Sequence, residues 1–224
     1  MTRLFGAFAV GLLAVGITQA HFPFVVPEPD GTAAKVVFSD DLTPDTKVNV
    51  EKLAGTKLAL RDSAGKDTPL EMKKGDGFYS VAVPGSGPRV VFGVTEYGVL
   101  QKGDANPFRL VYYPKAILGG VNAKPVGDPL KVEILAAGGP GKPRFQVVRA
   151  GKPAADAEVT VLLPGDGKEK KAVKTDREGF TPAFDKPGRY GVFARVTDPT
   201  AGEYAGKKYT ETRYYATLVV DIEK

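Results

Sequence analysis

The sequence contains no cysteine and a single histidine, His21. Without cysteine, the protein has no disulfide, no thiolate metal site and no cysteine nucleophile, so an exported form must be held together by its apolar cores. A Ser–His–Asp site needs an imidazole as its base, and the one imidazole is tied to the amino-terminal end of the chain.

Motifs for other common reactions are also missing. Ser86 stands in Gly-Ser-Gly without the wider nucleophile-elbow spacing, and Pro143 follows residues 138–142 where a phosphate loop needs Ser or Thr. No Asp/Asn/Gly series matches a calcium loop. The carboxylate pair Asp40 and Asp41 is expected in a solvated turn. The sequence does not exclude a glycosidase with two catalytic carboxylates, because the distance between the carboxylates depends on the three-dimensional structure. We expect that the protein is not an enzyme.

Only one long apolar run is present, at residues 4–17. It follows Arg3 and ends in Thr-Gln-Ala at residues 18–20, which is typical of a cleavable signal peptide over residues 1–20. A membrane anchor is the weaker alternative, because a span needs about 20 apolar residues. We expect a mature protein that begins at His21, lacks a membrane span and is exported to the periplasm or the medium.

The charges give no sign of a nucleic-acid partner. Without Arg3, the mature chain carries 30 Lys and Arg against 26 Asp and Glu, and the two signs are interspersed. The one dense basic run, at residues 168–174, includes Glu169 and follows a Gly-rich turn. A solvated loop explains such a run better than a nucleic-acid surface does.

The pattern of the remaining sequence predicts an all-β fold. The 27 glycines and 18 prolines separate short β-branched and aromatic runs, as in sandwiches and barrels. Several runs alternate with period two and so direct one face inward: Val159, Val161 and Leu163; Tyr190, Val192, Ala194 and Val196; Tyr79, Val81 and Val83. Residues 89–94 and 108–113 are apolar throughout and are expected to be covered on both faces. A short helix is expected after Thr43-Pro44-Asp45.

Two Gly/Pro-rich stretches, residues 119–129 and 136–143, are expected to be joints. We place a boundary near residue 128, which gives an amino-terminal β domain (21–128) and a second β-sandwich-like domain (129–224). One large sandwich with two long loops is the alternative. The second half resembles the transthyretin-like or carboxypeptidase-regulatory-like sandwich over residues 151–190, where Gly179 is expected to supply a positive φ. This fold says little about function.

His21 is the candidate site residue. As the first residue of the mature chain, it would offer an α-amino nitrogen, whose ordinary pKa is about 7.7–8.0, and an imidazole. Together these favour copper or nickel. Pro23 has no N–H, so amide chelation cannot extend to it, and further ligands must be Asp, Glu, Tyr, Met or water. The alternative is a ring that simply packs against Phe22 or Phe24.

The chain resembles domain-of-unknown-function family 4198, exported proteins related to the periplasmic part of nickel and cobalt uptake systems. The motifs that carry this resemblance are residues 21–27 (HFPFVVP), 110–116 (LVYYPKA), 151–190, 202–209 (GEYAGKKY) and 213–218 (RYYATL). The resemblance implies a β-rich first domain, a transthyretin-like second domain and transition-metal handling at His21. Related chains carry a further histidine where Tyr214 stands here, so a multi-histidine site is lost.

The sequence thus predicts an exported, non-catalytic β-sandwich protein that binds copper or nickel at His21. The competing interpretation is a structural or protein-interaction module of the cell envelope, with an envelope or surface protein as partner and no metal. Carboxylates or tyrosines that converge on His21 would favour the metal, and a frayed, exposed end would favour the module.

Overall fold

The structure, a computed structural model, describes residues 21–121, 124–165 and 168–223, called the described residues below. The expected signal peptide at residues 1–20 lies outside them. Nearly all of their regular structure is β-strand, which confirms the all-β prediction. Among these residues, no helix has the length and apolar character that a membrane span needs.

An eight-stranded sheet forms the centre of the molecule. In spatial order it consists of β13 (Lys170–Lys174), β12 (Glu158–Leu162), β14 (Gly188–Asp198), β17 (Glu211–Ile222), β8 (Phe108–Leu118), β7 (Arg89–Leu100), β3 (Lys57–Arg61) and β4 (Asp67–Leu70). The pairing of β17 with β8 is parallel, with Tyr215 opposite Tyr112. The other neighbouring strands are antiparallel.

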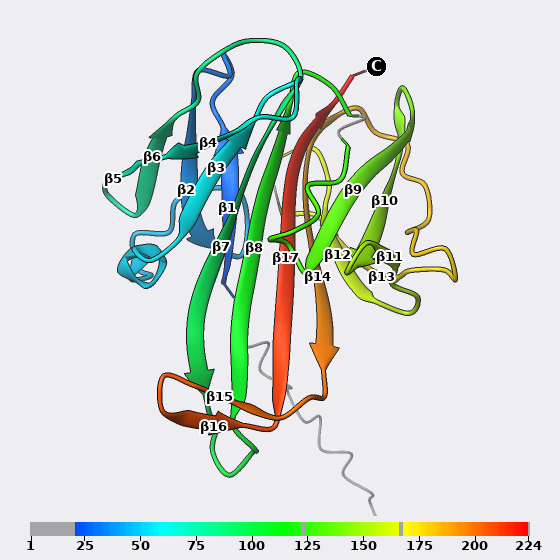
Figure 1. The fold of residues 1–224 in the computed structure, drawn as a ribbon. Helices are drawn as coiled ribbons and strands as arrows, with labels where there is room; N and C mark the ends of the chain where they lie inside the picture. Colours follow the sequence, from blue (N-terminus) through cyan, green and yellow to red (C-terminus); the bar gives the residue numbers. More distant parts are fainter. Residues whose placement is uncertain (1–20, 122–123, 166–167, 224) are drawn as a thin grey trace, which may run out of the picture.

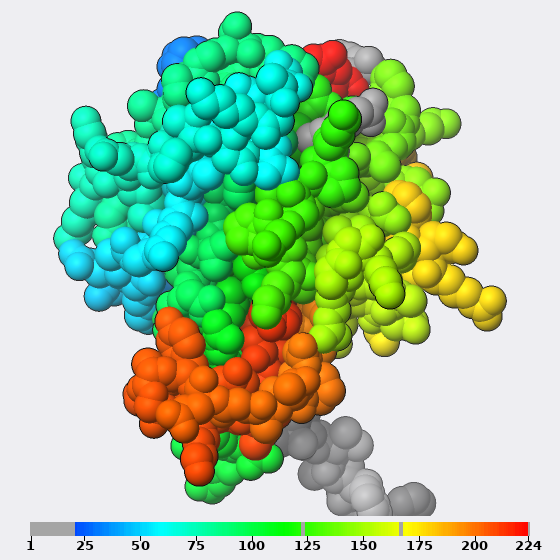
Figure 2. Space-filling view, in the orientation of Figure 1, coloured from blue at the N-terminus to red at the C-terminus, as the bar shows by residue number. Residues whose placement is uncertain are grey.

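Smaller sheets lie against the central one, on either side of it (Figure 1). One has the order β1 (Phe22–Pro27), β2 (Ala33–Ser39), β6 (Phe78–Ala82) and β5 (Met72–Lys74). The other has the order β11 (Lys152–Pro153), β10 (Lys142–Arg149) and β9 (Val132–Gly139). A hairpin of β15 (Gly202–Tyr204) and β16 (Lys207–Tyr209) lies across one end of the central strands, shown in orange in Figure 2.

Each face of the central sheet carries its own apolar core. Phe145 and Ile134 of the three-stranded sheet pack with Tyr190 and Leu218 of the central sheet. On the opposite face, Phe24, Val36 and Tyr79 pack with residues such as Val91 and Val219. The result is three β layers. It confirms that the apolar runs at residues 89–94 and 108–113 belong to strands covered on both faces.

The predicted period-two alternation is also confirmed. Val159, Val161 and Leu163 are buried in one core, and Tyr190, Val192 and Ala194 share it. Their strands are neighbours, with Val159 opposite Ala194 and Val161 opposite Val192. Val196 packs at the edge of the same core, and Tyr79, Val81 and Val83 lie together in the other core.

The division near residue 128 stays a prediction, and the central sheet bears on it. Residue 128 lies between β8 and β9. The sheet takes β3, β4, β7 and β8 from before this residue and β12, β13, β14 and β17 from after it. Each core likewise contains side chains from both halves, such as Phe92 with Val192 and Phe24 with Val219. The two halves therefore share one sheet.

Two local predictions were wrong. Residues 136–143 are not a joint but the tight connection of the β9–β10 hairpin, in which Gly139 pairs with Lys142. No helix begins at Thr43-Pro44-Asp45, where Oδ1 of Asp45 instead accepts the N–H of Lys47 at 2.9 Å and closes a turn. The helical turn comes later, as the 3₁₀ helix η1 (Val50–Leu53), whose cap Asn49 accepts the N–H of Glu51.

Gly179 has the predicted positive φ, at 78°. Its carbonyl accepts the N–H of Val147 at 2.8 Å and so ties the turn at residues 176–179 to β10. A Cβ at this position would lie 2.6 Å from the carbonyl oxygen of Val147. Glycine is therefore required both by the backbone conformation and by the close approach of β10.

Candidate functional site

His21 lies directly before β1, and β1 is held firmly on both sides. Phe22 pairs with Ser39 of β2. On the free edge of β1, Oγ1 of Thr217 donates to the carbonyl oxygen of Pro23 at 2.6 Å, and Nη1 of Arg189 donates to that of Pro27 at 2.8 Å. The start of β1 is therefore fixed on the central sheet rather than frayed.

The imidazole of His21 contacts one carboxylate and one aromatic ring. Its Nε2 lies 3.3 Å from Oδ2 of Asp45, and the two side chains are 21 % and 31 % exposed. Its ring centroid lies 5.9 Å from that of Phe38, at an interplanar angle of 52°. The sequence-based alternative, that the His21 ring packs against Phe22 or Phe24, named the wrong aromatic residues. Phe22 stacks on Phe193 with ring centroids 4.0 Å apart, and Phe24 lies in the core.

An aromatic wall continues from Phe38 across the central sheet. Phe38 contacts Tyr97 and Tyr112, with centroids 6.1 and 6.2 Å away. Tyr112 in turn contacts Tyr215 at 5.8 Å. Burial raises the pKa of the Tyr112 phenol above its ordinary value, and the charges that Tyr97 and Tyr215 would carry as phenolates raise it further. Tyr112 is thus a neutral phenol near neutral pH and a poor source of an anionic metal ligand.

The side-chain donors around His21 are few. Within the described residues, no three His, Cys, Asp or Glu side chains gather closely enough to hold a metal ion. The imidazole with Asp45 is therefore a two-residue arrangement. A site for one copper or nickel ion fits it only if the α-amino nitrogen of His21 is free, because that nitrogen supplies the second strong donor.

Asp40 and Asp41, the carboxylate pair noted in the sequence, make structural contacts within the fold. Oδ2 of Asp40 pairs with Nζ of Lys170 at 3.0 Å. Oδ1 of Asp41 accepts the N–H of Thr43 at 2.7 Å and the hydroxyl of Ser39 at 3.1 Å. Both lie in the connection after β2, as expected for turn residues. Tyr214, where related chains were expected to carry histidine, packs in the core against Tyr113 with centroids 5.9 Å apart.

Sequence reasoning identified His21 but missed Asp45 and Phe38 as its neighbours. Asp45 is 24 residues away along the chain, in the segment where we expected a helix. Phe38 comes to His21 because β2 runs antiparallel to β1. A hairpin reading of residues 22–39 would have placed Phe38 near His21, but no local signal connects Asp45 to this end of the strand.

Comparisons with known proteins identify no family. No family model and no curated protein match the chain. The resemblance to family 4198 therefore stays a prediction, while the coarser description as a β-sandwich-like protein stands.

Among solved structures, the chain is similar to a tetra-tandem repeat from the extending region of a large adhesion protein. The identity is 14 %, the TM-score 0.24, and the match covers 90 % of this chain and 50 % of that one. A pullulanase of Anoxybacillus sp. LM18-11 complexed with maltotetraose is 15 % identical, with a TM-score of 0.20, and the match covers 78 % of this chain and 22 % of the pullulanase. A DUF3823 family protein of Bacteroides ovatus ATCC 8483 is 13 % identical, with a TM-score of 0.22, and the match covers 92 % of this chain and 100 % of that one. The chain thus spans half the length of the adhesion-protein chain and about a fifth of the pullulanase. At these TM-scores the likenesses carry no argument about function.

Proposed function

We propose that this is an exported, non-catalytic β-sandwich protein whose mature form begins at His21 and binds one copper(II) or nickel(II) ion there. The α-amino nitrogen and the imidazole Nδ1 of a terminal histidine lie on the same residue, so they close a small chelate ring around one ion. Nε2 lies on the far side of the imidazole and cannot take part in that ring. Amine and imidazole nitrogens are donors that copper(II) and nickel(II) favour.

The contact between Nε2 of His21 and Oδ2 of Asp45, at 3.3 Å, carries the proposal. A metal-bound histidine commonly donates its second ring N–H to a carboxylate, which fixes the tautomer and the ring orientation. With Nε2 directed at Asp45, Nδ1 is left for the metal. Asp45 is itself oriented, because its other oxygen accepts the N–H of Lys47.

The surroundings support a single ion with open coordination positions. The ring of Phe38 packs beside the imidazole, tilted by 52° from it, and the described residues bring no third His, Cys, Asp or Glu to the pair. Water would fill the remaining positions. Asp45 orients the imidazole, and a bound metal ion would supply open coordination positions for further ligands.

The test is calorimetric titration of the exported, purified protein with copper(II) and nickel(II), after amino-terminal sequencing. We expect one ion per chain, with an affinity that falls as the pH is lowered, because protons compete for both nitrogens. His21→Ala should abolish specific binding. Asp45→Asn should weaken binding roughly tenfold, while Asp76→Asn, at an exposed turn, should leave the affinity unchanged.

A protein with a several-residue extension before His21 is the sharpest control, because it keeps the imidazole and moves the free amine out of chelating range. A single added residue would not serve, since its amine, the amide of His21 and the imidazole could together chelate copper(II). If the extended protein binds as tightly as the mature one, the chelate is wrong. If neither binds above background, or if the exported chain begins elsewhere, the alternative of a structural or protein-interaction module of the cell envelope is supported instead.

A further inference from the structure

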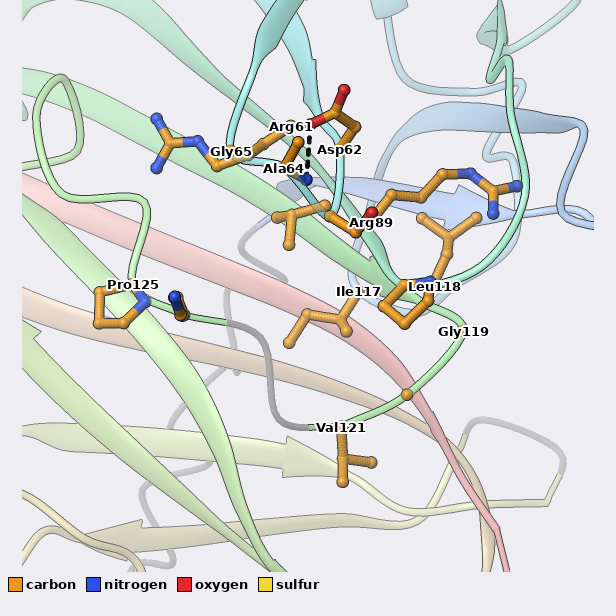
Figure 3. A pocket seen from close by; sticks show the side chains of 15 residues that line it. Arg61, Asp62, Ala64, Gly65, Arg89, Ile117, Leu118, Gly119, Val121 and Pro125 are labelled. Carbon is orange, nitrogen blue, oxygen red and sulfur yellow. Dashed lines mark hydrogen bonds between the residues drawn. The ribbon is translucent and has the colours of Figure 1, made fainter.

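A cavity of about 470 Å³ opens where β7 begins and β8 ends. It is called the end cavity here, and it is lined by residues 61–65, 88–90, 117–121 and 124–125. Figure 3 shows Ile117, Val121 and Pro125 around the hollow, with the turn that carries Asp62 and Ala64 on its far side. It shares no lining residue with the His21 site.

The floor of the end cavity is apolar. Val90 and Ile117 belong to the core between the central and three-stranded sheets, and Val121 packs against the same core. Pro88 and Pro125 add further apolar surface to the lining. Ligand pockets of about 300–1,000 Å³ with mainly apolar walls and a few polar groups are the usual sites for small molecules. The end cavity has this size and character.

Most charged side chains at its rim already form an ion pair or hydrogen bonds. Arg61 makes a two-pronged ion pair with Asp67, with both N–O distances at 2.7 Å. Oδ1 of Asp62 accepts the N–H groups of Ala64 and Lys66, each at 2.9 Å. The guanidinium group of Arg89 donates to two backbone carbonyls, those of Gly87 and Gly31, and Figure 3 shows it directed away from that of Arg61.

Lys124 differs from Arg89, which is buried and held by the two carbonyls. The side chain of Lys124 is exposed at the rim, and it makes no ion pair with any residue in the parts of the chain that the structure describes. Arg89 has no carboxylate partner either, and Asp62 has no cationic one, among the described residues. With Arg61 balanced by Asp67, the exposed ammonium group of Lys124 leaves this rim with a net positive charge above an apolar floor. A ligand that satisfies both has an apolar body and a single anionic end.

We propose that the end cavity binds a small amphipathic carboxylate, with its apolar body on Val90, Ile117 and Val121 and its carboxylate at the ammonium group of Lys124. This is a second binding site, independent of the metal proposed at His21. The apolar body gains free energy by leaving water, and the ion pair with Lys124 selects the anion over neutral and cationic molecules of the same shape.

Octanoate, 1-octanol and octylammonium are matched probes, because they share the apolar chain and differ in charge. Each is titrated into the ¹⁵N-labelled protein without added metal, so a failure of the metal proposal does not affect the result. We expect octanoate to shift the amide signals of Ala64, Gly120 and Val121. Octanol should bind more weakly, and octylammonium should cause no shifts there.

Two variants complete the test. Lys124→Glu should weaken octanoate binding roughly three- to tenfold, as expected for an exposed ion pair that is reversed, whereas Lys207→Glu, in the β15–β16 hairpin, should not. Ala64→Trp should block binding by filling the hollow, and its thermal unfolding shows whether it is folded. Equal binding of octanol and octanoate, or shifts that do not concentrate at these residues, would overturn the proposal.

Discussion

Nζ of Lys115 lies 2.7 Å from Oε1 of Glu133, and each side chain is only 2 % exposed. Glu133 also accepts the backbone N–H of Val126 at 2.9 Å and that of Gly127 at 3.3 Å. Burial lowers the pKa of the Lys115 ammonium group, and the charge and hydrogen bond of Glu133 oppose this shift. The pair ties the connection between β8 and β9 to the central sheet.

Removal of one partner should therefore be costly. We expect Lys115→Met to lower the free energy of unfolding by about 3–5 kcal/mol, because Glu133 would stay buried without its counter-ion. Urea denaturation at pH 7 measures this. Lys124→Met, at an exposed lysine, is the matched control and should cost less than about 0.5 kcal/mol. A cost below about 1 kcal/mol for Lys115→Met would contradict the buried pair.

Substitutions at Gly179 and Gly206 test whether the turn at residues 176–179 needs glycine because β10 approaches it closely. Both have positive φ, 78° and 76°, but only Gly179 has a backbone atom within reach of an added Cβ. Gly206→Ala should cost about 1 kcal/mol from strain alone. Gly179→Ala should cost about 3 kcal/mol, since it also breaks the hydrogen bond to Val147. Thermal unfolding compares them, and equal effects would show that the close approach does not matter.

Low pH should reduce the stability of the fold, because the carboxylate of Asp41 in the connection after β2 becomes protonated. Burial alone would raise the pKa of this carboxyl, but hydrogen bonds from Thr43 and Ser39 outweigh it and hold the pKa below its ordinary 3.8. A lowered pKa stabilises the fold above the ordinary value, and this stabilisation is lost as the pH falls through the folded-state value. Between pH 7 and pH 3, Asp41→Asn should therefore lose less stability than the wild type does, as urea titrations at both pH values measure. Parallel losses would contradict this.

The fragment 129–224 tests the predicted division. On its own it contains β17 without its neighbour β8, and it exposes Leu162 and Val219, which pack in the core shared with β1 and β2. We expect no cooperative unfolding transition in circular dichroism, whereas the whole protein should show one. A cooperative transition of the fragment would support two independent domains.

Local periodicity predicted those features of the fold that depend on neighbouring residues. The alternation of Tyr190, Val192 and Ala194 identified a half-buried strand, and the turn chemistry identified Gly179. The parallel pairing of β8 with β17 escaped prediction, because it joins residues about a hundred positions apart and leaves no mark on either strand alone. Pro114 and Lys115 would suggest the end of a strand, yet β8 continues to Leu118.

At the candidate site, too, the sequence predicted local features but not contacts between distant residues. His21 could be singled out from its place after the expected signal peptide. Its contact with Asp45 depends on where the connection after β2 lies in space, and turn residues alone do not specify that. The buried Glu133 partner of Lys115 was hidden for a related reason. A lysine within an apolar run indicates a surface position until the opposing carboxylate is known.

The position of β17 also sets the order in which the fold can be completed. It is the last strand of the described residues, and it lies between β14 and β8. Until it is in place, both of those strands keep an open edge, and an open edge readily pairs with another chain. During synthesis from the amino terminus, the chain would thus hold two halves with open, aggregation-prone edges until β17 is available to pair with both. Truncation before Glu211 would leave both edges open permanently.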